Sequence, residues 1–381
     1  MPLRYPPLRL NRELGEGLLA IQEKRVGTSD ARPLLGTLLQ AALQLEFSTV
    51  PVYLSAAFSL TDENESIADL IARVAQEEML HMAVVANLMN ACSIPPDIKG
   101  SAPVYPYSLD ALDPPIRLDL KSFSLELVED MFMRIETPEE PRVFPELSVL
   151  TRQAPRTIGQ FYEAIIDIIR HDRIPDLFKD AERDLYKQVK VVPNFRPVAY
   201  TSNDDSHDYP LPGDIDFVID AKDAAVRHLV WLVQQGEGSV PNPLSSEGLP
   251  GHYYRFESIL REKYLVTDPN VREGYSYSGG DLLFSPSGVH EFAVNAKEED
   301  YINGSRVRVR MNEFNKKYTQ MVDHLHSAFN CPSSNQQQQA AEEYESSLQI
   351  MRGLQNKSSQ IISAAAQAGV KAGIPFQYGL H

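Results

Sequence analysis

The stretch LLQAALQLEFSTVPVYLSAAFSL (residues 38–60) carries the first strong helical pattern of the chain. Its apolar side chains recur three and four residues apart, as they do on one face of a helix. The pattern predicts a long helix over residues 33–60, kinked at Pro51 because proline lacks the amide hydrogen that the preceding turn needs. Glu46 interrupts this apolar face. A buried carboxylate is costly unless it is paired or bound to a metal, so Glu46 is either a metal ligand or part of a buried ion pair, for instance with Arg73.

A second helical pattern covers residues 66–94 and contains VAQEEMLHMAVVANLMNA (residues 74–91). Ser66 and Asp69 have the spacing of a capping box at its start, and Pro95 follows its end. Because the connection to the first helix is short, we expect the two helices to pack as an antiparallel hairpin.

On this second helix Glu78 and His81 lie three residues apart, and therefore on one face. A carboxylate and a neutral imidazole at this spacing can bind the same metal ion, and di-iron helical bundles combine such Glu-x-x-His pairs with single glutamates from other helices. The pair also occurs by chance, but Glu46 on the facing helix strengthens the prediction of a metal site. Glu77 lies beside the same face, and spacing alone favours Glu78 over it.

The remaining patterns predict a mainly α fold, a ferritin-like four-helix bundle with a long crossover and extra C-terminal helices. The expected elements are a proline-rich crossover over residues 97–155 with a short helix at 125–134, a third helix at 156–171, a fourth helix in two pieces at 223–235 and 252–264, a strand- and loop-like segment at 268–309, and helices at 314–329 and 340–368. Residues 1–275 are expected to form the bundle with the metal site. Residues 276–381, a loop and strand segment followed by a helical hairpin, are expected to pack on it.

Composition narrows the classes of partner. The chain has 52 acidic and 36 basic residues, a formal net charge of −16, which disfavours binding to nucleic acid or to an anionic membrane. Cys92 and Cys331 are its two cysteines, so a disulfide framework, a structural zinc site or an iron–sulfur cluster is not expected. The sequence shows neither the apolar run of a signal peptide nor a stretch of about 18 apolar residues that would span a bilayer. A cytoplasmic location is the expectation.

The sequence resembles the ferritin-like domain of the iminophenyl-pyruvate dimer synthases, enzymes of bisindole pigment biosynthesis related to chromopyrrolate synthase. The resemblance covers nearly the whole chain and is carried by the two segments quoted above and by FMRIETPE (132–139), TIGQFYEAI (157–165), LVQQGEG (232–238), HYYRFESI (252–259) and AGIPFQY (372–378). It implies that Glu46, Glu78 and His81 bind a metal from the first helix pair, and that Glu237 and His252 complete the site from the second pair.

Two features depart from a regular di-iron bundle. Glu237 and His252 are separated by a Gly- and Pro-rich insertion, residues 238–251, instead of lying three apart on one helix. We expect this loop to bring His252 back so that both residues approach the ion from the side opposite Glu78. Glu163 is the single carboxylate of TIGQFYEAI, but it lies off the apolar face of its helix. It is either a further ligand or a surface residue, and without it the site is mononuclear or asymmetric.

Three other side chains receive ordinary interpretations. Trp231 is expected in the core and His228 on the polar face of the fourth helix. Arg255 either binds a substrate carboxylate or, as we prefer, forms an ion pair or lies exposed.

The predicted function is a metal-dependent oxidoreductase or oxidative coupling enzyme of specialised metabolism, iminophenyl-pyruvate dimer synthase-like, acting on a small molecule that the resemblance suggests is aromatic and derived from an amino acid. Carboxylate and imidazole ligands suit iron(II), in a di-iron centre as one possibility, with manganese as the alternative. Iron storage or detoxification, and a non-catalytic ferritin-like binding protein, are the competing functions. The sequence is compatible with a homo-oligomer and does not specify the oligomeric state.

Overall fold

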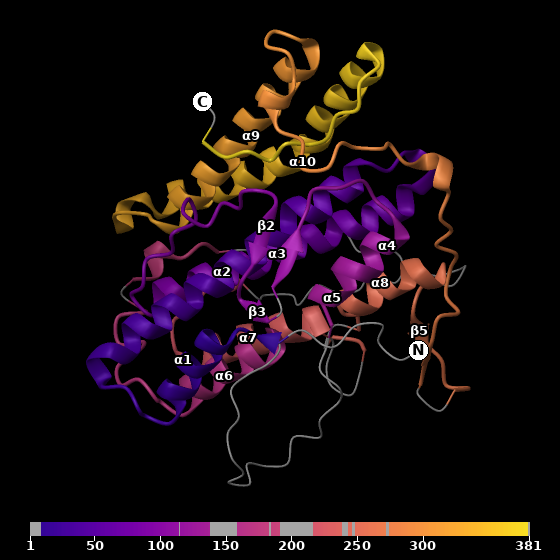
Figure 1. Ribbon diagram of the computed structural model, residues 1–381. Coiled ribbons are helices and arrows are strands. Elements are labelled where there is room, and N and C mark those ends of the chain that lie inside the picture. Colours follow the sequence, from indigo (N-terminus) through magenta and orange to yellow (C-terminus); the bar gives the residue numbers. More distant parts are fainter. Residues whose placement is uncertain are drawn as a thin grey trace.

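Two long helices run through the centre of the molecule, α2 (Thr28–Phe58) and α3 (Glu65–Ala91), joined by the short turn η1 (Asp62–Asn64) (Figure 1). The structure is a computed structural model that describes residues 9–113, 115–137, 158–182, 184–190, 216–237, 243–245, 248–271 and 274–379. The two helices pack along their length, and the short connection makes them antiparallel. The helical hairpin predicted from the sequence is confirmed.

The start of α3 differs from the prediction. Asn64 is the N-cap residue, but its side-chain amide donates to the carbonyl oxygens of Ser285 and Gly288, each at 2.9 Å, and does not cap the helix. Ser66 lies inside the helix, so the predicted capping box with Asp69 is wrong. A loop from the C-terminal part of the chain holds this helix end, and local sequence cannot reveal such a contact.

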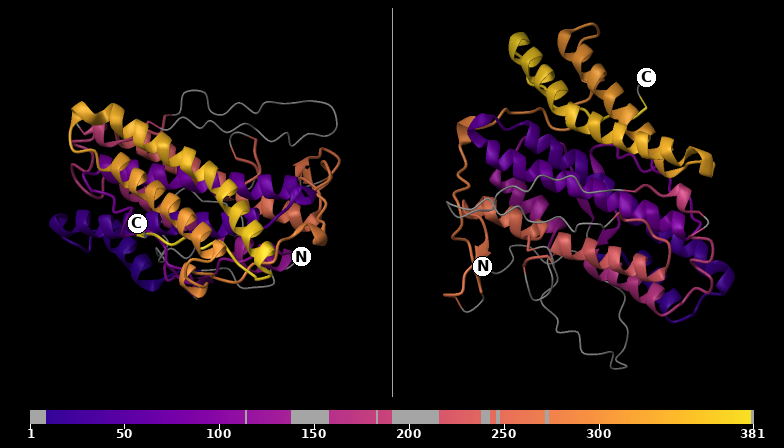
Figure 2. Two further views of the ribbon diagram at one scale, coloured as in Figure 1. Left: turned by 90° about the horizontal axis from the view of Figure 1, so that it is seen from above. Right: turned by 180° about the vertical axis from the view of Figure 1, so that it is seen from behind.

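A second layer of helices lies on one side of the central pair (Figures 1 and 2). It consists of α6 (Ile158–Arg170), α7 (Lys222–Glu237) and α8 (His252–Arg261), with α1 (Arg12–Gln22) packed against α6 and α2. The third helix and the two pieces of the fourth helix are therefore found close to their predicted bounds. α6 and α7 pack against each other, and α8 contacts both α3 and α7.

The crossover contains a short, irregular helix beside α8. It is made of α4 (Leu125–Leu127), the π-helical turn η2 (Val128–Phe132) and α5 (Met133–Ile135). The hydroxyl of Ser124 caps it by accepting from the amide of Leu127 at 3.0 Å. A π turn inserts an extra residue into a helix and is frequent at functional sites. Here it shortly precedes Glu136. The remainder of the predicted crossover, residues 138–155, lies outside the described part of the chain.

Short strands occur as three antiparallel pairs at the periphery. They are β1 (Arg9–Leu10) with β3 (Leu112–Asp113), β2 (Tyr107–Leu109) with β4 (Ile116–Leu118), and β5 (Val266–Thr267) with β6 (Tyr275–Ser276). Single turns of 3-10 helix also occur at η3 (Leu185–Lys187), η4 (Pro286–Gly288) and η5 (Glu298–Asp300). The segment predicted at residues 268–309 is strand- and loop-like until Ser305, where the next helix is capped.

The C-terminal helices α9 (Arg306–Phe329) and α10 (Gln337–Ala368), joined through η6 (Ser334–Gln336), form a hairpin on the opposite side of α2 and α3 (Figures 1 and 2). α9 begins eight residues before the predicted position 314, because Ser305 caps it by accepting from the amide of Arg308 at 3.3 Å. The hairpin contacts the bundle through Asn90, whose amide donates to the carbonyl oxygen of Phe329 at 2.8 Å. An ion pair of 2.9 Å between Lys99 and Asp323 adds a second link.

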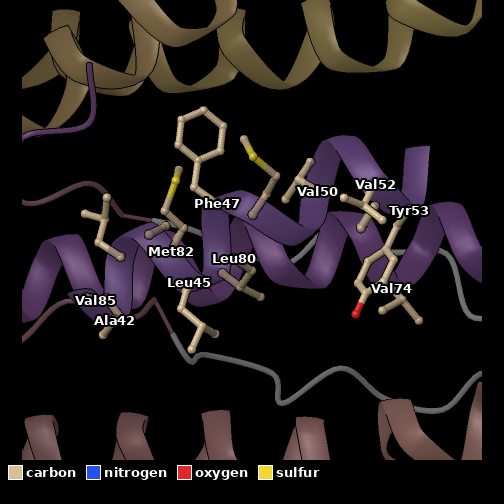
Figure 3. Close-up of a cluster of buried hydrophobic side chains, with 14 of the residues drawn as sticks. Ala42, Leu45, Phe47, Val50, Val52, Tyr53, Val74, Leu80, Met82 and Val85 are labelled. Atoms are coloured by element: carbon tan, nitrogen blue, oxygen red, sulfur yellow. The ribbon is translucent and has the colours of Figure 1, made fainter. Parts of the chain in front are cut away.

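The central helices are buried on both faces, which explains why they are apolar nearly all round. Figure 3 shows Phe47 and Met82 pointing toward the C-terminal hairpin, whereas Leu45 and the Tyr53 hydroxyl point to the opposite side. The polar groups of the next section lie on this second side. None of the helices in the described part of the chain combines the length and the apolar character needed to cross a bilayer.

Candidate metal centre

Glu78 lies at the centre of a buried cluster of carboxylates and histidines. It is 3% exposed, and α3 directs it toward the layer of α7 and α8. Its Oε2 is 3.4 Å from Nδ1 of His81, and its Oε1 is 2.8 Å from Nδ1 of His252. The two histidine rings stack with their centroids 5.4 Å apart. One carboxylate therefore contacts both imidazoles, each through a different oxygen.

The first group of potential metal ligands comprises Glu46, Glu78 and His81. Each offers one ligand atom, and these atoms lie within 4.8 Å of one another. Glu46 comes from α2, with its Oε2 3.6 Å from Nδ1 of His81, while Glu78 and His81 are one helical turn apart on α3. All three residues are buried.

The second group comprises Glu78, Glu136 and His252, again with ligand atoms within 4.8 Å of one another. Glu136 directly follows α5, and His252 is the first residue of α8. Nδ1 of His252 is 3.6 Å from Oε2 of Glu136. This nitrogen is fully buried and has no hydrogen-bond partner of good geometry among the described residues, although two carboxylates surround it. A buried nitrogen in these surroundings is suited to bind a cation.

A tyrosine donates to the outer carboxylate of each group. Tyr162 on α6 donates to Oε1 of Glu46, and Tyr53 on α2 donates to Oε1 of Glu136 at 2.6 Å. Burial, together with the adjacent carboxylates, raises the pKa of both Tyr53 and Tyr162 well above the usual value. Both phenols therefore stay protonated and keep one oxygen of each carboxylate engaged.

The second ring nitrogens of the histidines have unlike partners. Nε2 of His81 donates to the amide oxygen of Gln235 on α7 at 2.8 Å. Nε2 of His252 donates to Oε2 of Glu77 at 2.8 Å, and the other oxygen of Glu77 accepts from the guanidinium of Arg255, also at 2.8 Å. These bonds leave Nδ1 of each ring facing the carboxylates.

Burial and the neighbouring charges shift the pKa values of the titratable groups in the cluster. Burial and the negative charge of Glu78 raise the pKa of Glu46 to about 8, against the opposing effect of His81. Burial opposes a charged His81, but Glu78 and Glu46 raise its pKa to about 10. Burial likewise opposes a charged Glu77, but Arg255 and His252 lower its pKa to about 2.

Burial and neighbouring charges also shift the pKa values of Glu78, Glu136 and His252. Although burial opposes the charge of Glu78, His81 and His252 hold the pKa of this carboxyl below its usual range. Burial and Glu78 raise the pKa of Glu136. Burial would lower the pKa of His252, but Glu78 and the other carboxylates raise it well above the usual value. A bound cation would replace these protons, as is usual at buried sites of this composition.

A cavity of about 40 Å³ opens beside the cluster. Its lining includes the polar residues Glu46, Thr49, Glu78, His81, Glu136 and Tyr162, and the remaining lining residues are Leu45, Ile135, Ile158, Gly159, Leu232, Val233 and Gly236. Space of this size holds one or two small molecules of a few atoms. The carboxylates are therefore reachable from a small chamber with apolar walls.

The structure brings together four of the six residues predicted as ligands, Glu46, Glu78, His81 and His252. Contrary to expectation, His252 lies beside Glu78 and not opposite it. The side chain of Glu237 lies outside the described residues.

On α6, Glu163 is half-buried and belongs to neither group, whereas its neighbour Tyr162 contacts Glu46. Glu77 contacts the outer nitrogen of His252 and lies in neither group, so the preference for Glu78 over Glu77 agrees with the geometry.

Sequence reasoning missed Glu136, Gln235 and the two tyrosines. Glu136 and Gln235 stand within segments quoted above, FMRIETPE and LVQQGEG, but no periodicity singles them out. Arg255 is buried and ion-paired, as preferred. His228, expected on a polar face, is 6% exposed and packs against Phe217, because the chain after residue 215 covers this face of α7. Trp231 is in the core, as expected.

Comparisons with known proteins agree with this architecture. A sequence model of the family described as Ferritin-like matches residues 39–261. A crystal structure of a ferritin-like protein from Caulobacter vibrioides is similar to the chain at 19% sequence identity, with a TM-score of 0.50, over 98% of this chain and 100% of that one. The identity is low, so this likeness concerns the fold alone. No curated protein matches the sequence significantly.

Proposed function

Because this chain belongs to the ferritin-like family, we propose that it is a metal-dependent oxidoreductase with a dinuclear centre built around Glu78. The observation that carries the proposal is that Glu78 belongs to both ligand groups, Glu46–Glu78–His81 and Glu78–Glu136–His252. Each of its oxygens contacts a different histidine. Glu78 would therefore help to hold both ions, with Glu46 and His81 at one position and Glu136 and His252 at the other.

The donor atoms favour iron, with manganese as the alternative. They are carboxylate oxygens and imidazole nitrogens, and neither group contains a thiolate. The orphaned Nδ1 of His252 and the buried carboxylates fit a cation better than they fit a network of hydrogen bonds alone. Iron held here would supply one-electron redox chemistry and reactivity toward dioxygen.

The chain itself contributes orientation and exclusion of water. Tyr53 and Tyr162 fix one oxygen of Glu136 and of Glu46, which leaves the other oxygen of each carboxylate free to bind an ion. The apolar walls of the cavity, among them Leu232 and Val233, limit the number of water molecules that reach the cluster. A reactive site needs such shielding from side reactions.

We further propose an aromatic substrate derived from an amino acid, in an oxidative coupling or related oxidation. The support is the sequence resemblance to the iminophenyl-pyruvate dimer synthases, which includes the segments that carry Glu46, Glu78, Glu136 and His252. A cavity of about 40 Å³ is too small for an aromatic ring. The substrate must therefore approach from the mouth of the cavity or widen it on binding.

The proposal is tested by measuring dioxygen consumption of the chain loaded anaerobically with iron(II), with and without aromatic 2-imino or 2-oxo acids. The expected result is consumption that requires both the metal and an organic substrate, and that is lost in Glu78→Gln. Glu163→Gln serves as the matched control because it removes a half-buried carboxylate outside both groups. Uptake of thousands of irons per assembly without an organic substrate would indicate storage, and a metal-free protein would indicate a non-catalytic binding protein.

A further inference from the structure

We propose that the two metal positions are unequal, and that the position formed by Glu78, Glu136 and His252 fills first and more tightly because Glu77 is the positioning residue of His252. The proposal rests on the dinuclear centre proposed above and concerns how this chain distinguishes its two ions.

The outer partner of His252 is a carboxylate held in place on both of its oxygens. Oε2 of Glu77 accepts from Nε2 of His252 at 2.8 Å, and Oε1 accepts from Arg255 at 2.8 Å. Arg255 is itself fixed, because its Nε donates to the carbonyl oxygen of Pro250 at 2.7 Å. All three side chains of the Glu77–His252–Arg255 triad are buried. The imidazole is therefore locked in one orientation with Nδ1 toward Glu78 and Glu136.

The outer partner of His81 is a neutral amide. Nε2 of His81 donates to Oε1 of Gln235 at 2.8 Å, and Trp231 meets the ring edge-on with centroids 6.0 Å apart. An amide orients the ring as well as a carboxylate does, but it brings no negative charge. A carboxylate partner makes a metal-bound imidazole a stronger donor, and loss of such a partner typically lowers metal affinity about 10- to 100-fold. His252 is therefore the stronger ligand.

The cavity also distinguishes the two metal positions, because the histidine of one position lines it and the histidine of the other does not. All three members of the Glu46–Glu78–His81 group line it, whereas of the other group Glu78 and Glu136 line it and His252 does not. His252 is 0% exposed. The histidine of the tighter position is thus closed off from the cavity, whereas the weaker histidine, His81, lines it. An ion beside His81 is therefore expected to exchange more readily.

Substoichiometric loading of the unmodified chain tests the order of filling. We would add one equivalent of cobalt(II), as an air-stable probe with visible absorption bands, to metal-free protein and locate it by anomalous X-ray diffraction. The expected result is occupancy between Glu78, Glu136 and His252, with the second equivalent entering beside His81 at an affinity about 10-fold or more weaker. A first equivalent at the His81 position, or equal occupancy of both, would overturn the proposal.

Two reciprocal variants test the role of Glu77. Glu77→Gln should weaken the tighter of the two binding steps about 10- to 100-fold and leave the weaker step unchanged. Gln235→Glu should strengthen the weaker step and so reduce the difference. Both steps are measured by competition with a chelator, and the cobalt spectrum reports which histidine environment changes. A merely structural role of Glu77 would weaken both steps together and contradict the proposal.

Controls separate folding from metal binding. Glu77→Gln leaves Arg255 without its carboxylate, so helicity and melting temperature are compared with those of Glu163→Gln, in which neither step should change. Should Glu77→Gln fail to fold, Gln235→Glu and the location of the first equivalent in the unmodified chain still decide the question. Two ions bound with equal affinity would contradict this inference alone, whereas absence of any metal binding would contradict the proposed function as well.

Discussion

The hydroxyl of Tyr53 donates a hydrogen bond of 2.6 Å to Oε1 of Glu136, a residue 83 positions later in the chain. This contact joins the long helix α2 to the crossover segment and holds one of the two outer carboxylates of the candidate metal centre. The hydroxyl of Tyr162 on α6 likewise donates to Glu46, the other outer carboxylate.

Replacing Tyr53 by phenylalanine should release Glu136. We expect Tyr53→Phe to lower the affinity of the Glu78–Glu136–His252 position about 10-fold or more, because a carboxylate without its partner no longer holds one orientation. The free energy of unfolding should fall by about 1–2 kcal/mol. Metal titration and urea denaturation provide the two readouts.

Tyr105→Phe is the matched control for this variant. Tyr105 is equally buried and donates to the carbonyl oxygen of Ser48 at 2.7 Å, away from the two ligand groups. It should lose a similar amount of stability with unchanged metal affinity. If both variants lost metal equally, the hydrogen bond to Glu136 would have no specific role.

Gly236 controls the space beside the centre. A Cβ atom at this position would lie 3.9 Å from Oε2 of Glu136, an ordinary contact, and the residue lines the cavity. Gly236→Ala should therefore be accepted, whereas the larger side chain in Gly236→Leu should fill the 40 Å³ chamber at a stability cost of about 1–3 kcal/mol.

The two Gly236 variants are compared at equal metal content by the rate at which dioxygen reacts with the iron(II)-loaded protein. Slow reaction in Gly236→Leu and near-normal reaction in Gly236→Ala are expected. An unaffected rate in Gly236→Leu would show that small molecules reach the metals by another route.

His228 should make stability depend on pH independently of the metals. Burial, aided by Arg227, lowers the pKa of His228 to about 4. Below the pKa of about 6.5 of an unfolded histidine, the unfolded chain binds a proton that the folded chain does not, so stability falls as the pH decreases from 6.5 toward 4.

His228→Gln should remove about 2 kcal/mol of this loss, an amount reduced for partial solvent screening. The measurement is urea denaturation of metal-free protein between pH 7 and pH 4.5, with the unmodified chain beside it. Other titrating groups are common to both proteins and cancel in the difference. Parallel curves for the two proteins would contradict the assignment.

The C-terminal hairpin should depend on the bundle for its structure. The apolar residues Phe314, Tyr318, Met321 and Leu325 of α9 are fully buried. A segment beginning near Met311 should therefore not survive limited proteolysis as a stable fragment. Release of a folded fragment of this kind, judged by circular dichroism, would show that residues 276–381 do not need the bundle.

Helical spacing predicted Glu46, Glu78 and His81, which lie on the regular helices α2 and α3. Glu46 is exceptional within an apolar face, and Glu78 and His81 lie one turn apart, so both features are visible in sequence. Glu136 is different because it follows a π turn at the end of a crossover, where no period places it. Its position depends on tertiary packing against α8.

Long-range contacts account for the other differences. The position of His252 beside Glu78 follows from the packing of α8 against α3 and α7, which helical spacing does not specify. As the single carboxylate of its segment, Glu163 is a candidate ligand from sequence alone. In the structure, however, its neighbour Tyr162 on the buried face of α6 contacts Glu46. The start of α3 is likewise held by a distant loop, because the side chain of Asn64 donates to the carbonyl oxygens of Ser285 and Gly288, 221 and 224 residues later in the chain.

The central claim, a dinuclear centre that shares Glu78, is tested most directly by the metal content of the unmodified chain and of Glu78→Gln after anaerobic loading with iron(II). The amide of Glu78→Gln keeps the shape of the side chain but supplies neither the charge nor the second oxygen donor that a bridging ligand needs. We predict two ions per chain in the unmodified protein and in Glu163→Gln, and loss of both in Glu78→Gln at unchanged helicity. Two ions retained by Glu78→Gln would contradict the account.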